Sequence, residues 1–209
     1  MPAWALHLLP DAVDDAAGAM VEPGGNALRA ARAAALSPGD RVLVQGPGTI
    51  GLLAGMFAVA AGAEVHVLGL PGRGLDFART LGFAGVWTRD ELPDLVFHAV
   101  VDASTSSELP PLALELVEPG HRVVYIGLAG SPSPMDARLL TLKDVTAVGI
   151  LSASPGLAGA VQHYADGRVD PRPLVAATVG LSAVGDVLAG RLPADVGPGP
   201  KILVDPRAE

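Results

Sequence analysis

The sequence predicts an α/β fold: a doubly wound parallel sheet of about six strands, followed by a short C-terminal strand–helix–strand appendage. Two observations predict it. Short runs of apolar, β-branched residues alternate with helix-like runs along most of the chain, and half of the 209 residues are hydrophobic. Continuous apolar strands that alternate with helices are typical of a parallel sheet with both faces covered. Right-handed crossovers then wind such a sheet in both directions.

The expected elements follow from these local patterns. The β-branched and apolar runs predict strands at 41–45, 64–68, 85–88, 96–102, 122–126 and 145–151. The helix-like runs lie at 25–36, 49–62, 75–81, 109–117 and 157–166. A proline-rich break at 171–173 ends the alternation, and two short strands at 174–179 and 201–204 flank a small helix. We therefore expect a lead-in segment at 1–23, a sheet domain at 24–170, and an appendage at 171–209 that packs on the domain or on a partner.

Composition and charge argue against several function classes. The net charge is −8 and there are only two Trp and two Tyr, so the chain offers neither a basic patch nor stacking platforms for nucleic acid. It contains no cysteine, which excludes disulfides, thiolate nucleophiles and Cys-ligated zinc. The uncharged stretch 42–63 is long enough to span a bilayer, but a glycine-rich turn interrupts it. Because the first ten residues also lack the basic flank of a secretory signal, we expect no membrane association and a cytoplasmic location.

A glycine-rich turn lies between the first expected strand and the helix that follows it. Gly46, Gly48 and Gly51 fit the pattern G-x-G-x-x-G. The first glycine permits a tight turn, the second lets the backbone approach a pyrophosphate, and the third lets helix and strand pack closely. The helix N-terminus adds free N–H groups and the positive end of its dipole. This context is typical of the Rossmann fold and favours dinucleotide binding over a purely structural glycine turn.

The end of the second expected strand leaves the choice of cofactor open. An acid at this position usually binds the ribose 2′-OH of NAD, but this chain has Gly69 there. One interpretation is that the ribose contact is simply lost. The other is that the missing negative charge, with Arg73 close by, admits a 2′-phosphate. The second interpretation slightly favours NADP over NAD.

Several segments together resemble the cofactor-binding, C-terminal part of the zinc-type medium-chain alcohol and sorbitol dehydrogenases. They are Glu22-Pro23 and the segments 36–44, 46–51, 116–124, 127–130, 167–171 and 200–204. The resemblance covers nearly the whole chain, and the combined motifs are far more specific than the glycine turn alone.

This resemblance implies a set of cofactor contacts. The N–H groups of Thr49 and Ile50, with the three glycines, would meet the pyrophosphate. Ala103–Ser104, after the fourth expected strand, would lie along the cofactor. Gly127–Leu128, after the fifth, would approach the nicotinamide, and Lys201 would reach the pyrophosphate.

The resemblance also raises an expectation about what the chain lacks. In the family a catalytic domain precedes the cofactor-binding part and supplies the zinc ligands and most of the substrate pocket, and we expect that domain to be missing here. Glu22 matches a carboxylate near the zinc, but one carboxylate cannot hold a metal that needs three protein ligands. We therefore expect no zinc and no other metal site. In the family the sixth strand pairs with its mate across a two-fold axis, so a homodimer through the edge at 145–151 is expected.

Functions from different classes follow from these observations. The chain is either the NAD(P)-binding part of an oxidoreductase, orienting a nicotinamide for hydride transfer with an alcohol or ketone, or a non-catalytic NAD(P)-binding or regulatory module. An S-adenosylmethionine-dependent methyltransferase ranks third, because Gln45 and Gly69 stand where that class has acids. Asp102 ends the fourth expected strand, where ligands collect, but we interpret it as a loop cap rather than a catalytic acid.

Overall fold

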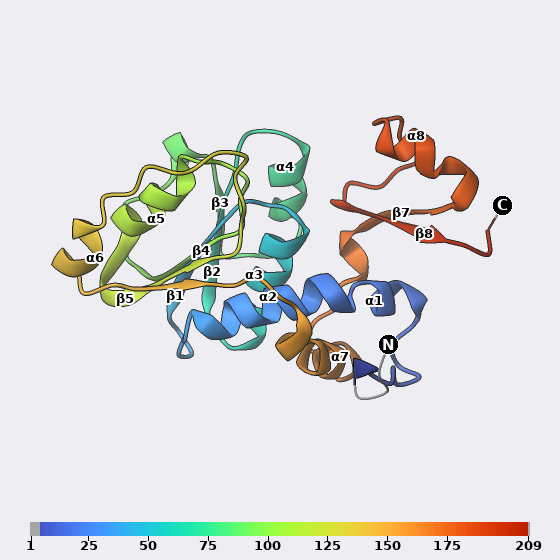
Figure 1. Cartoon of the computed structure of the whole chain (residues 1–209), viewed down its shortest axis with the longest axis horizontal. Helices are drawn as coiled ribbons and strands as arrows, with labels where there is room; N and C mark the ends of the chain where they lie inside the picture. The colour runs from blue at the N-terminus through green and yellow to red at the C-terminus, as the bar shows by residue number, and fades with distance from the viewer. Residues whose placement is uncertain (1–4, 209) are drawn as a thin grey trace.

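The computed structural model describes residues 5–208, and its largest part is a six-stranded parallel sheet (Figure 1). The strands are β1 (Arg41–Gln45), β2 (Glu64–Leu68), β3 (Gly85–Trp87), β4 (Phe97–Asp102), β5 (Val117–Tyr125) and β6 (Thr146–Gly149). They lie in the order β3–β2–β1–β4–β5–β6, and every neighbouring pair runs parallel. The direction of winding reverses between β1 and β4, which confirms the predicted doubly wound fold.

Helices cover both faces of this sheet. The α-helices of the described residues are α1 (Asp15–Ala19), α2 (Val21–Ala33), α3 (Thr49–Ala60), α4 (Arg73–Arg79), α5 (Leu109–Leu116), α6 (Arg138–Leu142), α7 (Leu157–Ala165) and α8 (Val184–Leu188). Helix α2 packs against α3 and α7, whereas α5 packs against β4 and β5. Alternate residues of β1 enter two separate cores, with Val42 and Val44 in one and Leu43 in the other. The central strand is thus buried on both sides, as a parallel sheet requires.

The strands predicted at 41–45 and 64–68 are confirmed at both ends. The helix predicted from residue 25 begins instead at Val21. Pro23 lies in its first turn, where a missing N–H costs no hydrogen bond. A Cβ on Gly24 would overlap the hydroxyl of Tyr164 in α7, so this glycine serves packing between helices rather than ending one.

Two short helices and the start of one strand were not predicted. Helices α1 and α6 have five residues each, too few to show a helical period. The N-terminus of α1 is capped by Asp14, whose Oδ1 accepts from the N–H of Ala17 at 2.8 Å. Strand β5 begins at Val117 rather than 122 and passes through Gly120 at φ +78°.

The uncharged stretch 42–63 folds as most of β1, the glycine turn and α3, as predicted. Over residues 5–208, no helix combines the length and the hydropathy needed to cross a membrane.

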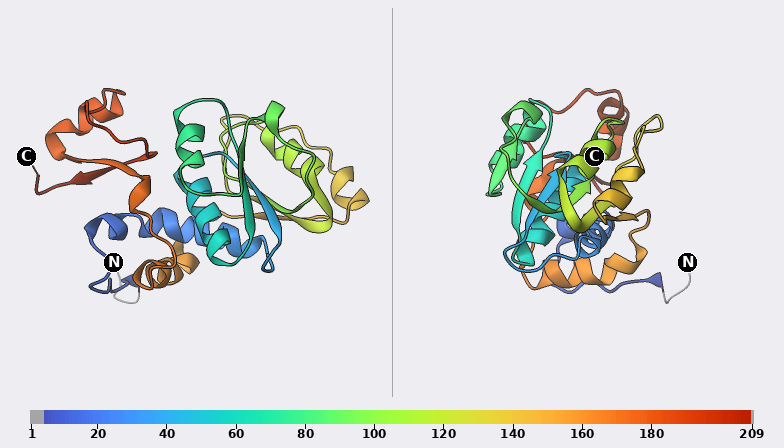
Figure 2. Two further views of the ribbon diagram at one scale, coloured as in Figure 1. Left: turned by 180° about the vertical axis from the view of Figure 1, so that it is seen from behind. Right: turned by 90° about the vertical axis from the view of Figure 1, so that its left-hand side faces the viewer.

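The C-terminal residues form a second, smaller sheet. Strands β7 (Val175–Gly180) and β8 (Lys201–Asp205) pair in parallel, with α8 between them in the chain, which confirms the predicted strand–helix–strand order. This unit lies to one side of the six-stranded sheet and close to α1 (Figures 1 and 2). Ion pairs reach α1 and the residue before it, with Arg172 Nε 2.8 Å from Asp14 Oδ2 and Arg207 Nη2 2.6 Å from Asp15 Oδ2.

Candidate functional site

The glycine-rich turn joins β1 to α3 as predicted. Gly46 has φ +100°, and its N–H donates to the carbonyl oxygen of Leu68 at 2.8 Å, which ties the turn to β2. A Cβ added at Gly51 would overlap the carbonyl oxygen of Gly46, so only glycine allows helix and turn to pack this closely. A Cβ added at Gly48 would meet no atom within 4 Å. The backbone at Gly48 therefore faces open space, as the approach of a pyrophosphate requires.

Helix α3 begins directly at this turn. Gly48 is its N-cap residue, no side chain caps the N-terminus, and its first turn has no acid. The N–H groups of Thr49 and Ile50 lie in the first turn, where an α-helix has no intrahelical acceptors for them. The 12-residue helix adds the positive end of its dipole at the same place. Together these features make an anion-binding position.

The turn forms one wall of a cleft of about 640 Å³. Four segments line it, each at the carboxyl end of a strand: 46–48, 68–75, 88–90, and 103–106 with 108 and 109. The cleft brings together six of the predicted site residues, namely Gly46, Gly48, Gly69, Arg73, Ala103 and Ser104. Ligands of open α/β sheets bind outside the carboxyl ends of the strands where the strand order reverses, and this cleft lies at that point.

Arg73 lies at the start of α4 and connects the cleft to the C-terminal unit. Its Nη2 donates to the carbonyl oxygen of Val196 at 3.2 Å and to that of Gly197. Both acceptors belong to the loop before β8. The guanidinium therefore already has two backbone partners, and its predicted contact with a 2′-phosphate stays a prediction.

A second cleft, of about 440 Å³, follows the carboxyl ends of β4 and β5. Gly127 and Leu128 line it, and Ser104 lines both clefts. A Cβ on Gly127 would lie 2.6 Å from the backbone nitrogen of Ser104, so the two loops touch through their backbones. The structure thus places Gly127, predicted to approach the nicotinamide, beside Ser104, predicted to lie along the cofactor.

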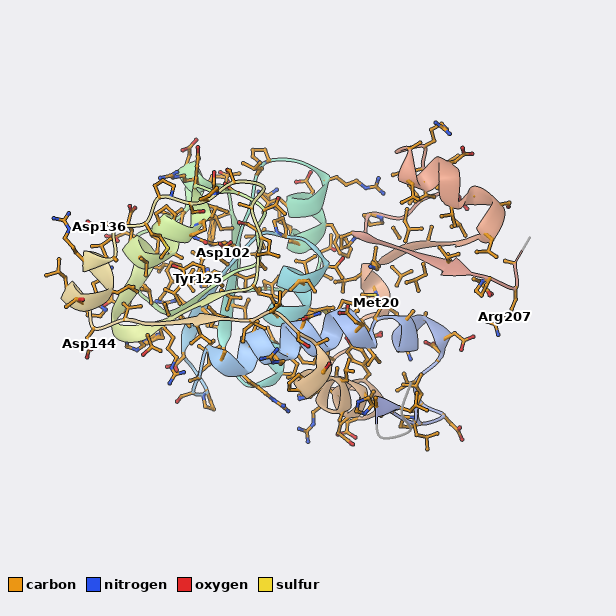
Figure 3. The ribbon with its side chains drawn as sticks, in the orientation of Figure 1. Met20, Asp102, Tyr125, Asp136, Asp144 and Arg207 are labelled. Carbon is orange, nitrogen blue, oxygen red and sulfur yellow. The ribbon has the colours of Figure 1, made fainter. Side chains whose placement is uncertain are left out.

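Asp102 and Tyr125 lie opposite each other in the register of β4 and β5, at the base of the second cleft (Figure 3). Asp102 Oδ1 accepts from the N–H of Ser104 at 3.0 Å, which fits the loop-cap interpretation, and burial raises the pKa of the Asp102 carboxyl. The Tyr125 hydroxyl donates to the carbonyl oxygen of Pro110 at 3.1 Å. Burial, and secondly the charge of Asp102, raise the pKa of Tyr125 to about 12. The phenol therefore stays protonated at neutral pH.

Two of the predictions concern residues away from these clefts. Lys201 opens β8 and is not among the residues that line either cleft, so its contact with the pyrophosphate stays a prediction. Glu22, at the start of α2, accepts from Asn26 Nδ2 at 2.8 Å. In the part of the chain that the structure describes, no three His, Asp or Glu side chains gather into a metal-binding cluster.

The residues at or near the site that sequence reasoning did not assign a role there include Pro47, Arg89 and Gln45. Pro47 and Arg89 line the larger cleft. Gln45 ends β1 and is fully buried, and its Nε2 and Oε1 have no hydrogen-bond partner among residues 5–208. The available signal was position alone, because each residue is the last of a strand or follows a strand within two positions.

Known proteins are similar to this chain in sequence and in fold. A family model described as zinc-binding dehydrogenase matches residues 49–165. A D-xylulose reductase of Morganella morganii is 28% identical in an alignment of 188 residues that covers 85% of this chain and 56% of that protein. The structure of the short chain alcohol dehydrogenase rspB from Escherichia coli CFT073, complexed with NADH, has a TM-score of 0.87 at 21% identity, over 98% of this chain and 63% of that one. The structure of S. aureus TarJ in complex with NADPH has a TM-score of 0.74 at 18% identity, over 87% of this chain and 61% of that one.

The chain covers only part of these proteins. It spans between 54% and 56% of the length of three curated relatives. At these identities the two solved structures establish a shared fold.

Proposed function

Because the chain belongs to the zinc-binding dehydrogenase family, we propose that it binds a nicotinamide dinucleotide and orients it for hydride transfer with an alcohol or ketone substrate. One observation carries the proposal. The backbone at Gly48 faces open space at the N-terminus of α3, inside a cleft made by four strand ends. A diphosphate fits this position because it needs close backbone approach, free N–H groups and a positive dipole end.

The rest of the cofactor would follow the two clefts. The adenosine ribose would lie near Gly69, and Ala103–Ser104 would lie along the middle of the cofactor. The nicotinamide would reach Gly127–Leu128, and Lys201 would approach the diphosphate from the C-terminal unit. When bound, the nicotinamide supplies the carbon that carries the hydride, while this chain binds and orients it.

NADP is slightly favoured over NAD in this proposal. No acid follows β2 at Gly69, and Arg73 lies on the same side of the cleft. The two similar structures were solved with NADH and with NADPH, so either dinucleotide suits the fold.

The catalytic partners and the assembly also belong to the proposal. The relative from Morganella morganii is named D-xylulose reductase, and xylulose is a ketose, which supports an alcohol–ketone pair as substrate. The proposal also includes that this chain alone binds no zinc and that it works in the cytoplasm. The outer edge of β6 has no neighbouring strand in the six-stranded sheet, and Thr146 and Ala147 on it are exposed. Pairing of two such edges would give a homodimer, which light scattering would detect as a doubled mass.

Titration of the chain with NADPH and NADH, followed by nicotinamide fluorescence, tests the proposal. We expect dissociation constants between about 1 μM and 1 mM, the range of ordinary enzyme ligands. Gly48→Val should weaken binding at least ten-fold without unfolding the protein, because its side chain would fill the open space. Leu188→Ala, on the exposed surface of α8, is the matched control. Absence of binding of either cofactor at millimolar concentration would overturn the proposal, and binding without turnover of any alcohol or ketone would support the non-catalytic module instead.

A further inference from the structure

The turn residue Pro47 covers the position that normally reads the adenosine ribose. A Cβ added at Gly69 would lie 2.7 Å from Pro47 Cδ and 2.8 Å from Pro47 Cγ. On another side it would lie 3.1 Å from Leu75 Cδ1. Carbon atoms in contact sit about 3.5–4.0 Å apart. With proline at 47, therefore, position 69 has no room for any side chain, and not only for a carboxylate.

Neither side of this contact can move away easily. The proline ring has no rotamer that withdraws Cγ and Cδ, because the ring closes on its own backbone nitrogen. The preceding residue is anchored to β2 through the 2.8 Å bond from Gly46 N–H to Leu68 O. On the other side, the Gly69 N–H donates to the carbonyl oxygen of Trp87 at 3.0 Å. Backbone hydrogen bonds therefore hold the chain in place on both sides of the contact.

We propose that Pro47 and Gly69 act together as one specificity determinant. Their contact excludes an acid from position 69, here called the ribose corner, and so favours a dinucleotide with a 2′-phosphate at this position. This inference rests on the proposed cofactor binding. It differs from the simple absence of an acid, because it makes the choice at position 69 depend on the residue at position 47.

The charges that line the cleft are evenly divided between basic and acidic side chains. Arg73 and Arg89 both line the cleft, and Arg89 takes part in none of the ion pairs found within the described ranges. The acids Asp90 and Glu108 also line the cleft, so the corner is balanced rather than strongly basic. An additional carboxylate at position 69 would tip this balance against a phosphate.

The first arm of the test needs no cofactor. Gly69→Ala and Pro47→Ala are made singly and together, and the Tm of each full-length protein is measured. We expect Gly69→Ala to lower the Tm by roughly 5 °C in the native background, as overpacking does, and by less than half as much in the Pro47→Ala background. Additive changes in Tm would overturn the steric part of the proposal.

The second arm measures NADPH and NADH binding with Gly69→Asp in both backgrounds. In the Pro47→Ala background, the new carboxylate should reach the ribose hydroxyls and raise NADH affinity at least ten-fold over Pro47→Ala alone, while NADPH affinity falls. With the native Pro47, NADH affinity should not rise. Gly74→Asp is the matched control, because a Cβ there stays at ordinary contact distance from Pro47, 3.6 Å from its O and 3.7 Å from its Cγ. It adds the same charge without the overlap, so its effect should not depend on residue 47.

The outcomes separate this inference from the function on which it rests. If the native chain binds NADPH but Gly69→Asp alone gains NADH affinity as fully as the double variant, the proline is irrelevant and the inference fails. If the native chain binds neither cofactor, the proposed function fails, and the cofactor part of the inference fails with it.

Discussion

The six-stranded sheet and the two-stranded sheet are both parallel, yet they are buried to very different extents. In the large sheet, Val42, Leu43 and Val44 of β1 are at most 1% exposed, because helices cover both faces. In the small unit, Leu181 is 60% and Leu188 83% exposed. Burying a leucine side chain contributes roughly 1.5–3 kcal/mol. The buried residues of β1 therefore stabilise the fold, whereas these two exposed leucines contribute little.

The links between the two parts are apolar as well as polar, because Leu174 and Leu203 are buried in the same hydrophobic core as Val42 and Val44 of β1. Arg172 and Arg207 form ion pairs with Asp14 and Asp15, and Arg73 donates to two carbonyl oxygens of the small unit. Exposed ion pairs each contribute about 0–1 kcal/mol. The difference teaches that the large sheet is buried on both faces, whereas the small unit joins the shared core through a few residues and leaves α8 in solvent. Substitutions should therefore have effects that depend strongly on which part they touch.

Gly51→Ala should have the largest effect. Its Cβ would overlap the carbonyl oxygen of Gly46, a backbone atom that cannot rotate away. Overpacking of this kind costs about 1–3 kcal/mol or more, and the gain in helix propensity returns at most about 1 kcal/mol. We expect a net loss of about 2 kcal/mol in urea unfolding, together with loss of cofactor binding.

Gly48→Ala is the control in the same turn. Its Cβ would meet nothing within 4 Å, so its free energy of unfolding should change by less than about 0.5 kcal/mol. Equal losses from the two variants would show that the turn does not have the packing described.

Gly24→Ala should cost about 1 kcal/mol. Its Cβ would overlap the hydroxyl of the buried Tyr164, whereas alanine has a higher helix propensity than glycine. Tyr164→Phe in the same chain should restore part of the loss, although it also removes the 3.1 Å bond from the hydroxyl to Met20 O. Urea unfolding of the four proteins measures the coupling. Additive losses would mean that α2 and α7 do not meet at this point.

These two glycines also show how far the sequence predicts the structure. The turn around Gly51 has a local signature between a β-branched run and an apolar helix, so its place in the fold and in the site was predictable. Gly24 follows a proline, and locally that pattern opposes a helix. Glycine is required at position 24 because Tyr164 packs there. Tyr164 lies far along the chain, so no local pattern around Gly24 predicts the contact.

The same limit applies within the cleft. The strands at 41–45 and 64–68 were predictable because both are short runs that contain two valines and a leucine. The contact of Pro47 with Gly69 depends on β1 and β2 pairing in register, with Gln45 beside Leu68. Local sequence patterns do not show which residues of two strands pair, so they could not predict this contact.

Glu64 gives a smaller, pH-dependent effect at the start of β2. A hydrogen bond from Arg41, and secondly one from His66, lower the pKa of Glu64 to about 2. Because the pKa is lower in the folded than in the unfolded chain, the stabilisation is complete above about pH 4.5 and is lost as the pH falls towards 2. The side chain is 41% exposed, so solvent screening limits the contribution to about 0.5 kcal/mol.

Glu64→Gln should therefore flatten the change of unfolding free energy between pH 4.5 and pH 2 relative to the native chain. Glu115→Gln, at an exposed position of α5, is the control and should leave the slope unchanged. A native slope in Glu64→Gln would show that the pair with Arg41 does not form in solution.

Leu188→Ala should have the smallest effect, within about 0.5 kcal/mol of the native chain, because the side chain is 83% exposed on α8. The same residue type buried in the large sheet would lose about 2–5 kcal/mol on truncation to alanine. Urea unfolding of Leu188→Ala and of Leu181→Ala, its neighbour in the small unit, measures this limit. A loss above about 1 kcal/mol in either variant would place a packed core in the small unit and remove the contrast between the two sheets.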